Sequence, residues 1–294
     1  MKIIVTGSLG NVGQPLAATL VRQGHAVTVI SSSPAKRAAI EALGAAAAIG
    51  SLEDAAFLAA TFAGAAAVFA MVPPPPPAAD RVAQYRRIAT GYVQAGQQAG
   101  VPRMVHLSSW GAEQARGVGP IKGSHAGEQV LNAGLPDVAL THLRPCSFYP
   151  NLLSYIPLIK NAGFVGTNYG PDTRQVFVAP ADIAAVAAQE LTSPAGPAFR
   201  YIASDERPAA DIARVLGAAI GRPELPWREL TDEQVQANLE RAGLPAPFGR
   251  DLVELGAALR TGLLRQGYDQ HPPAALGPVK LEDYAREFAV RFAE

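Results

Sequence analysis

The first thirteen residues constrain the fold of this chain most strongly. An apolar, β-branched run at residues 3–5 has the length of a buried strand, and residues 14–23 carry apolar side chains at helical spacing. Gly7, Gly10 and Gly13 lie between the two segments. A glycine turn between a strand and a helix lets the backbone approach a pyrophosphate, and the helix N-terminus offers unpaired N–H groups to that anion. This context predicts a dinucleotide site, although glycines alone also mark ordinary turns.

The same alternation of short strands and helices continues along the chain. Further strands are expected at residues 25–30, 45–49, 66–72, 103–107, 138–143 and 199–203, with helices at 34–43, 53–62 and 79–99. Such alternation is typical of a parallel sheet wrapped by right-handed crossovers, so the prediction is an α/β protein. In such a sheet the loops that follow the strands collect at one edge, where ligands bind.

The domain organisation follows from where this pattern changes. Residues 1–150 are expected to form a nucleotide-binding domain whose sheet is completed by segments near 174–205. Residues 151–173 and 206–294 are expected to form a small, mainly helical lobe that covers the strand ends. The five prolines at 73–77 cannot join a helix or sheet interior. They are interpreted as a stiff connection, with a partner-binding tract as the alternative.

Composition excludes several classes of function. The 294 residues are 49% hydrophobic and 17% charged with a formal net charge of zero, which argues against a nucleic-acid or anionic-membrane surface. The single Cys146 excludes an internal disulfide, and no metal-ligand spacing is present. No apolar stretch is long enough to span a bilayer, and the first strand begins without a signal segment. We expect a cytoplasmic protein that binds a small-molecule substrate, and a homodimer is left open.

The residues after the second expected strand favour one cofactor over another. Enzymes that prefer NAD place an acid there to bind the ribose 2′-hydroxyl, whereas this chain has no acid before Glu41. It has Ser31, Ser32 and Ser33, followed by Lys36 and Arg37. Hydroxyl groups and cations suit a 2′-phosphate, so NADP(H) is predicted in preference to NAD(H).

Several longer segments then carry a family resemblance. TGSLGNVGQPL (6–16), AAAVFAMVPP (65–74), MVHLSSWGA (104–112), GPIKGSHAGEQVL (119–131) and LRPCSFYPNLL (143–153) resemble the NmrA-like branch of the atypical short-chain dehydrogenase/reductases. Later segments at 174–188 and 282–289 resemble it too. That branch includes NAD(P)H-dependent quinone and dye reductases as well as redox-sensing regulators. The resemblance implies a Rossmann-type, doubly wound parallel sheet with a small C-terminal lobe.

The resemblance also implies where the cofactor lies. Gly7, Ser8, Leu9, Gly10, Asn11 and Val12 would hold the pyrophosphate, and the serines and cations at 31–37 would face the adenosine ribose. Ser51 and Leu52 would lie near the adenine, with Ser51 in place of the family's usual acid. Met71, Val72, Pro73, Ser108 and Ser109 would border the second ribose, and Pro145, Cys146 and Phe148 would lie near the nicotinamide.

One expected feature of such reductases is absent. The usual Tyr and Lys, four residues apart, fall at Pro120 and Ser124 in this chain, and Lys122 is two residues out of register. Without that pair, carbonyl reduction by the usual proton transfer is not expected. Quinones, cationic dyes and conjugated enones can accept hydride without it.

Two other side chains are candidate proton donors. Histidine is the side-chain type best suited to proton exchange near neutral pH, and His125 follows the fifth expected strand. Tyr149 lies on the loop after the sixth expected strand. Packing roles for both remain open, as does a redox role for Cys146 against simple core packing.

Two functions therefore remain. The first is an NADPH-dependent oxidoreductase that passes hydride to a quinone-like or other conjugated apolar acceptor. The alternative is a non-catalytic NAD(P) sensor that binds a protein partner.

Overall fold

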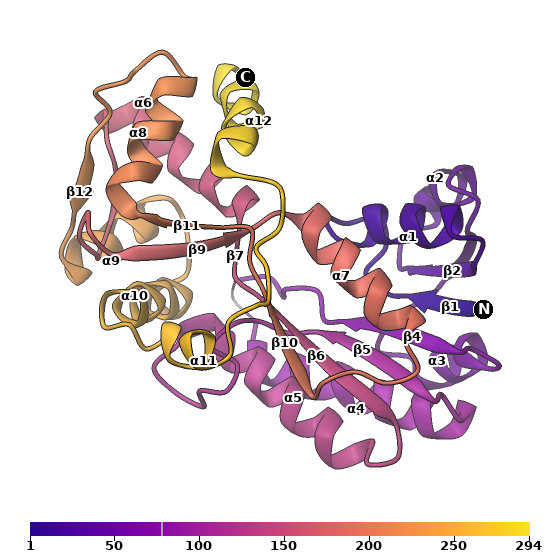
Figure 1. Ribbon diagram of the computed structural model, residues 1–294. Coiled ribbons are helices and arrows are strands. Elements are labelled where there is room, and N and C mark those ends of the chain that lie inside the picture. Colours follow the sequence, from indigo (N-terminus) through magenta and orange to yellow (C-terminus); the bar gives the residue numbers. More distant parts are fainter. Residues whose placement is uncertain (78) are drawn as a thin grey trace.

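A seven-stranded parallel sheet forms the larger part of the molecule (Figure 1). In the computed structural model, which describes residues 1–77 and 79–294, the strand order is β10-β6-β5-β4-β1-β2-β3. The strands are β1 (Lys2–Val5), β2 (Ala26–Ser31), β3 (Ala46–Ile49), β4 (Ala67–Met71), β5 (Arg103–Leu107), β6 (Ala139–Pro145) and β10 (Phe199–Ile202). This order confirms the expected Rossmann-type, doubly wound architecture.

Helices cover both faces of this sheet because its strands alternate their side chains between two cores. Ile3 and Val5 of β1 join the core beneath α1 (Gly13–Arg22) and α7 (Pro180–Thr192). Ile4 points the other way, into the core beneath α3 (Ala55–Phe62), α4 (Arg81–Ala99) and α5 (Lys122–Gly134). A 3-10 turn at Pro34–Lys36 leads into the short α2 (Arg37–Ala42). None of the helices in the described residues is long and apolar enough to cross a membrane.

The second part of the molecule mixes helices with two small sheets. β7 (Ser147–Phe148), β9 (Arg174–Val178) and β11 (Asp205–Pro208) form one sheet, and β8 (Val165–Thr167) pairs with β12 (Trp227–Glu229). The helices are α6 (Ile156–Ala162), α8 (Ala209–Ala219), α9 (Asp232–Arg241), α10 (Ala246–Arg260), α11 (Arg265–Gln270) and α12 (Leu281–Ala293), with 3-10 turns at Gly119–Ile121 and Tyr149–Tyr155. This part caps one end of the large sheet in Figure 1.

These small sheets were not predicted from the sequence. Residues 174–178 were expected to complete the large sheet, but β9 pairs with β7 and β11, and only β10 joins the large sheet. Strands of two to five residues carry too little periodicity to reveal a partner, because pairing depends on distant segments.

A buried ion pair fixes α7 against the large sheet. Arg103 of β5 donates from Nη2 to the Glu190 carboxylate of α7 at 2.8 Å, and from Nε to the Glu190 carbonyl. The two residues are 3% and 5% exposed. Arg200 of β10 also contacts Glu190, at 3.1 Å. Arg103 also donates to the Thr141 hydroxyl of β6. The ion pairs of Glu190 and the hydrogen bonds of Arg103 thus connect β5, β6 and β10 to α7.

Replacing Arg103 with Met should destabilise the fold by about 3 kcal/mol, the lower end of the range for breaking a buried pair, because Arg200 still contacts Glu190. Urea unfolding measures the change. The matched control is Arg214→Met, which removes an exposed pair with Asp211 and should change stability by less than about 0.5 kcal/mol. Equal effects of the two substitutions would contradict a structural role for the buried pair.

Candidate functional site

Parallel pairing brings the residues after β1, β2, β4, β5 and β6 to one edge of the sheet. Hydrogen bonds between these loops extend the strand pairing beyond the sheet. Ser8 N donates to the Ile30 carbonyl at 3.0 Å, and Ser108 N donates to the Leu143 carbonyl at 2.8 Å. The loops that the sequence assigned to a cofactor therefore lie side by side.

The glycine turn forms a cradle without side chains. Gly7 has φ +90° and Ser8 has φ +58°, so the chain turns through left-handed conformations immediately after β1. A Cβ on Gly13 would collide with the Ser8 carbonyl oxygen, and one on Gly10 would lie 3.3 Å from the Gly7 carbonyl oxygen. Gly13 therefore requires glycine on steric grounds, whereas a side chain at Gly10 would make a tight contact.

The same turn offers donors to an anion. Helix α1 has no side-chain cap at Val12. Within the described part of the chain, the backbone N–H groups of Gly10, Asn11 and Val12 make no hydrogen bond. Unpaired N–H groups at a helix N-terminus bind phosphate, so this turn fits the pyrophosphate of a dinucleotide.

Of the serines and cations expected to face the adenosine ribose, some are exposed and others are engaged by neighbouring residues. Ser31 is the last residue of β2 and is buried, and its hydroxyl accepts from Ser8 Oγ at 3.0 Å and from Ser33 N at 3.2 Å. Its hydroxyl therefore joins the two loops. Ser32 and Lys36 are exposed, whereas Arg37 turns to Glu41 at 3.5 Å.

The third strand end is only partly open. Ser51 is exposed and accepts from Glu53 N at 3.1 Å, which leaves its hydroxyl proton free to donate. Leu52 is half-buried and packs against the core beneath α3. These two residues border the edge where the adenine is expected.

A buried hydroxyl network that the sequence analysis missed holds the middle of the edge. Thr6 Oγ1 accepts from Met71 N at 2.9 Å, and the Tyr92 hydroxyl donates to the Met71 carbonyl at 2.7 Å. Tyr92 is fully buried in α4, and burial raises the pKa of its hydroxyl. Its apolar spacing in the helix resembles that of any core residue, so no sequence signal distinguished it.

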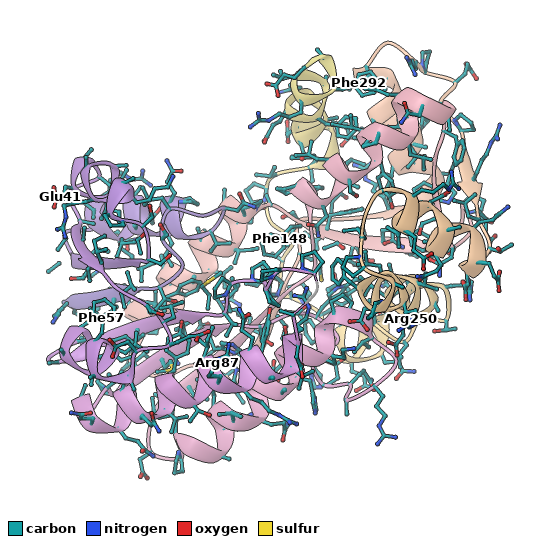
Figure 2. All side chains as sticks on the ribbon, turned by 180° about the vertical axis from the view of Figure 1, so that it is seen from behind. Glu41, Phe57, Arg87, Phe148, Arg250 and Phe292 are labelled. Atoms are coloured by element: carbon teal, nitrogen blue, oxygen red, sulfur yellow. The ribbon has the colours of Figure 1, made fainter. Side chains whose placement is uncertain are left out.

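An apolar wall lies beside this network. Leu9, Met71, Leu107 and Phe148 are partly buried side chains at the strand ends, and all four pack against the core beneath α1 and α7. Figure 2 shows Phe148 between the two parts of the molecule. Val72 is buried and Pro73 is half-buried, and the Pro73 carbonyl accepts from the Gln84 side chain at 3.0 Å. The wall provides an apolar surface for a planar ring.

A charged network beneath Ser108 determines what its hydroxyl can do. Ser108 Oγ donates to Glu128 Oε1 at 2.5 Å, and Arg144 forms a bidentate pair with the same carboxylate at 3.0 and 2.6 Å. Glu128 is 3% exposed. Burial opposes its ionisation, but the hydrogen bonds and charge of Arg144 prevail and lower the pKa of Glu128. Ser108 thus gives its proton to a carboxylate and presents only lone pairs to a ligand.

The position of the missing catalytic pair is occupied by other residues. Pro120 lies in the 3-10 turn before α5, and Ser124 is buried in its first turn. Lys122 is held by Asp251 of α10 at 2.6 Å. His125 is half-buried, and its Nδ1 lies 2.8 Å from the Ala112 carbonyl oxygen. Because a carbonyl only accepts, Nδ1 carries a proton and Nε2 is the nitrogen available for exchange.

Tyr149 and Cys146, the other two residues considered for chemistry, are both buried. Tyr149 is fully buried between the rings of Phe177 and Tyr284, and its hydroxyl donates to the Val279 carbonyl at 3.2 Å. Burial raises its pKa. Cys146 is buried as well, and burial raises the pKa of its thiol.

The backbone at the sixth strand end is also engaged. The Pro145 carbonyl accepts from Trp110 N at 3.1 Å, and Ser109, half-buried, lies between Ser108 and that tryptophan. The described residues contain no group of three or more His, Cys, Asp or Glu side chains that could hold a metal ion.

Comparisons with known proteins agree with this geometry. A family model described as NAD(P)H-binding matches residues 7–194, and the chain belongs to this family. A relative from Streptomyces griseus, (4-alkanoyl-5-oxo-2,5-dihydrofuran-3-yl)methyl phosphate reductase, is 31% identical over 264 residues. The match covers 88% of each chain. The predicted NAD(P)H cofactor class is therefore confirmed.

Solved structures show the same fold at lower identity. A quinone oxidoreductase from Escherichia coli, solved with NADPH, has a TM-score of 0.77 at 21% identity and covers 97% of this chain and 99% of its own. A triphenylmethane reductase from Citrobacter sp., solved with NADP(H), has a TM-score of 0.79 at 20% identity and covers 98% and 99%.

Replacing Gly13 with Ala should weaken NADPH binding at least about tenfold, which corresponds to 1.4 kcal/mol. The added Cβ meets the Ser8 carbonyl and forces the phosphate cradle open. Titration of NADPH fluorescence measures the dissociation constant. The control is Gly96→Ala in α4, because the added Cβ would make only ordinary van der Waals contacts, at 3.4 Å with Leu135 and 3.5 Å with Met104. An unchanged affinity in a folded Gly13→Ala protein would contradict the assignment of the cradle.

Proposed function

We propose that this protein is an NADPH-dependent reductase that delivers hydride to a conjugated, apolar acceptor such as an enone or a quinone. The observation that carries the proposal is the state of the proton donors at the edge. Pro120 and Ser124 stand where a catalytic pair would be, and the Ser108 proton is committed to Glu128. Such a site suits substrates that need no strong acid at the carbonyl oxygen.

Different residues along this edge of the sheet would bind different parts of the cofactor and the acceptor. The free N–H groups of the glycine turn hold the pyrophosphate, and Ser32 with Lys36 binds a 2′-phosphate. The acceptor-only Ser108 hydroxyl receives a hydrogen bond from a ribose hydroxyl. The bound cofactor supplies a hydride from its nicotinamide ring. The wall of Leu107 and Phe148 orients the flat acceptor and excludes water.

The electron balance of the reaction is simple. Hydride adds to the β-carbon of an enone, the electron pair of the double bond moves toward the carbonyl oxygen, and a proton then adds to the α-carbon. Nε2 of His125 in its protonated form, or water, supplies that proton. Tyr149 is not assigned this role, because its hydroxyl already donates to Val279.

The Streptomyces relative supports this choice of acceptor. The substrate in its name has a ring double bond conjugated to two carbonyl groups, on a ring that also carries a methyl phosphate. That chemistry is the kind that a hydride can reduce without protonation of a carbonyl oxygen by tyrosine. The low-identity quinone and dye reductases share the fold and are consistent with a flat, conjugated acceptor.

An acceptor panel tests the proposed reaction. NADPH oxidation should be detected with a 2-acyl-butenolide, a simple cyclic enone or a benzoquinone, and should be absent with a saturated ketone of similar size. His125→Gln should lower kcat several-fold at pH 8 while leaving the NADPH dissociation constant unchanged. Reduction of the saturated ketone at a comparable rate would overturn the proposed mechanism. Tight NADPH binding without turnover of any acceptor would favour a dinucleotide sensor instead.

Cofactor preference provides a separate prediction. Lys36→Glu should raise the dissociation constant for NADPH about tenfold or more and leave that for NADH nearly unchanged, because the 2′-phosphate meets a like charge. Calorimetric titration with both dinucleotides measures it. Arg22→Glu, at the far end of α1, is the control for overall charge. Equal affinity of the wild-type protein for NADH and NADPH would exclude the predicted preference.

A further inference from the structure

A cavity separates the glycine turn from the last helix of the chain. Its volume is 360 Å³, which lies within the usual range for small-molecule sites. Asn11 of the glycine turn and Pro15 of α1 border it on one side, and Pro180 borders it from α7. The opposite wall is formed by α12, the yellow helix above and to the left of α7 in Figure 1. Both parts of the molecule therefore contribute to one hollow.

A buried hydroxyl in this wall has no partner. Tyr284 of α12 is 6% exposed and lines the cavity, and its hydroxyl makes no hydrogen bond within the described residues. Burial raises the pKa of this hydroxyl, and the nearby Glu287 carboxylate adds to the effect. An unsatisfied buried hydroxyl is costly, and a bound ligand that offers a polar group would satisfy it.

The charge of the lining is negative. Asp283 and Glu287 are its two ionisable acids, and no Lys or Arg lines the cavity. Asp283 is partly compensated by Arg286 at 3.6 Å and by Lys280 N at 3.1 Å. None of the ion pairs among the described residues involves Glu287, and Arg291, one turn further along α12, pairs with Glu294. Arg291 also acts on Tyr284, where it opposes the effect of Glu287 on the pKa. Asp283 and Glu287 are both exposed at the cavity rim, and with no cation in the lining they favour a positive charge over a negative one at the Glu287 end.

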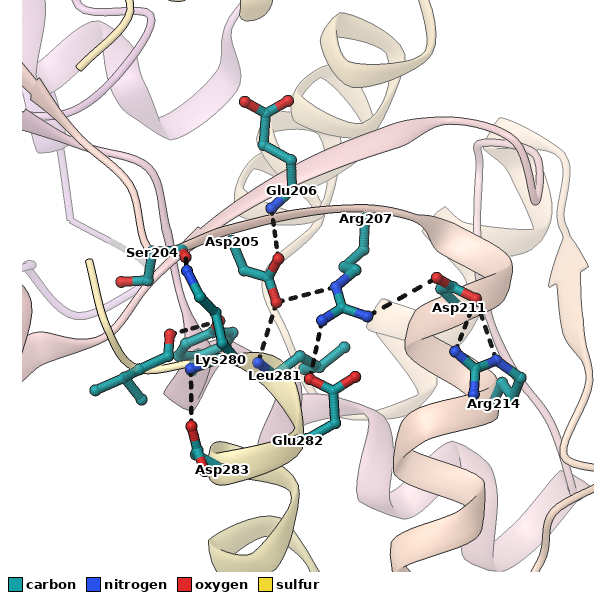
Figure 3. A network of polar contacts seen from close by, with 12 residues as sticks. Ser204, Asp205, Glu206, Arg207, Asp211, Arg214, Lys280, Leu281, Glu282 and Asp283 are labelled. Carbon is teal, nitrogen blue, oxygen red and sulfur yellow. Dashed lines mark hydrogen bonds and ion pairs between the residues drawn. The ribbon is translucent and has the colours of Figure 1, made fainter. Parts of the chain in front are cut away.

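The wall that carries these groups is held firmly. Figure 3 shows Asp205 accepting from Arg207 and from Leu281 N at the start of α12. Lys280 Nζ donates to the Ser204 carbonyl at 2.6 Å. Because this network fixes the first turn of α12, Tyr284 and Glu287 keep their positions on the cavity wall without a ligand.

The remaining lining is apolar and partly aromatic. Tyr149, Pro150, Ala179, Ala181 and Val279 complete the walls. A flat apolar body fits against such a surface, and a cationic group at one end would meet Glu287. The ring faces of Tyr149 and Tyr284 are stacked on each other at 5.2 Å between centroids, so a ligand in the cavity would meet ring edges rather than ring faces.

We propose that this cavity binds an aromatic or alicyclic ammonium compound, with its apolar body between α7 and α12 and its cation beside Glu287. The site is separate from the proposed hydride-transfer edge. Of the residues expected to contact the cofactor, only Asn11 also lines it. A bound ammonium compound would join the glycine turn to α12 and act as an effector of the enzyme rather than as its substrate.

Calorimetric titration of the whole protein with 1-naphthylmethylammonium tests the proposal. Two probes of the same shape serve as comparisons: neutral 1-naphthalenemethanol and anionic 1-naphthoate. The ammonium probe should bind at least tenfold more tightly than the alcohol, and the carboxylate should not bind. Equal affinity for ammonium and alcohol would overturn the charge argument, and preferential binding of the carboxylate would overturn the site.

Variants locate the binding site. Glu287→Gln should reduce ammonium affinity to that of the alcohol, and Tyr284→Phe should weaken binding of both probes several-fold. Glu224→Gln, an exposed carboxylate outside the cavity, should have no effect. Thermal unfolding of each variant checks that it remains folded. Unchanged affinity in folded Glu287→Gln, or complete competition between the ammonium probe and NADP⁺, would place the probe elsewhere and refute the proposal. These readouts need no turnover, so they are independent of the proposed reductase reaction.

Discussion

The parallel pairing of β1 with its neighbours is the constraint on which the rest of the structure depends. Parallel strands must return through crossovers, so all their carboxyl ends lie at the same edge. Ile3 and Ile4 supply opposite faces of β1 to two separate cores, and both cores are completed by the returning helices. The site then arises where that packing stops, at the turn after Val5, because the glycines there leave backbone groups without partners.

The buried ion pair between Glu128 and Arg144 determines the hydrogen bonding of Ser108 at that edge. The Glu128–Arg144 pair is expensive to desolvate and is retained with good geometry and full hydrogen bonding. Its effect on Ser108 is chemical as well as structural, since the serine hydroxyl becomes an acceptor. A carboxylate two elements away thus decides the polarity of a group at the cofactor edge. Together with the absence of a Tyr–Lys pair at the positions that the family resemblance indicates, this arrangement supports the proposal that the acceptor needs no strong proton donor.

The smaller part of the molecule contributes through contact with the glycine turn rather than through its own chemistry. Tyr149, which follows the last residue of β7, stacks within this part, and α12 faces Asn11 across a cavity. The polar network at Asp205 and Lys280 keeps α12 in place. Asn11 lines this cavity and belongs to the turn that we propose for the pyrophosphate, so a ligand bound in the cavity would influence dinucleotide binding.

The strands and helices of the large sheet, and the glycine turn between β1 and α1, could be predicted from the sequence. Periodicity of two or 3.6 residues and the spacing of Gly7, Gly10 and Gly13 are properties of neighbouring residues. The family resemblance also placed Pro120 and Ser124 at the positions of the usual Tyr and Lys, and this placement stays a prediction. The small sheets were missed, because strands as short as β7 have no readable period.

The contacts between distant segments were decided only by the tertiary structure. Glu128 meets Arg144 across sixteen residues, Tyr92 reaches Thr6 across 86, and Tyr149 reaches Val279 across 130. The last of these contacts commits the hydroxyl of Tyr149 to a carbonyl, and a further contact with Ser8 holds the buried hydroxyl of Ser31. No local pattern encodes them, because a side chain's partners depend on how whole elements pack. The sequence by itself therefore determined which cofactor class the edge receives, and the packing decided which side chains remain free to act on it.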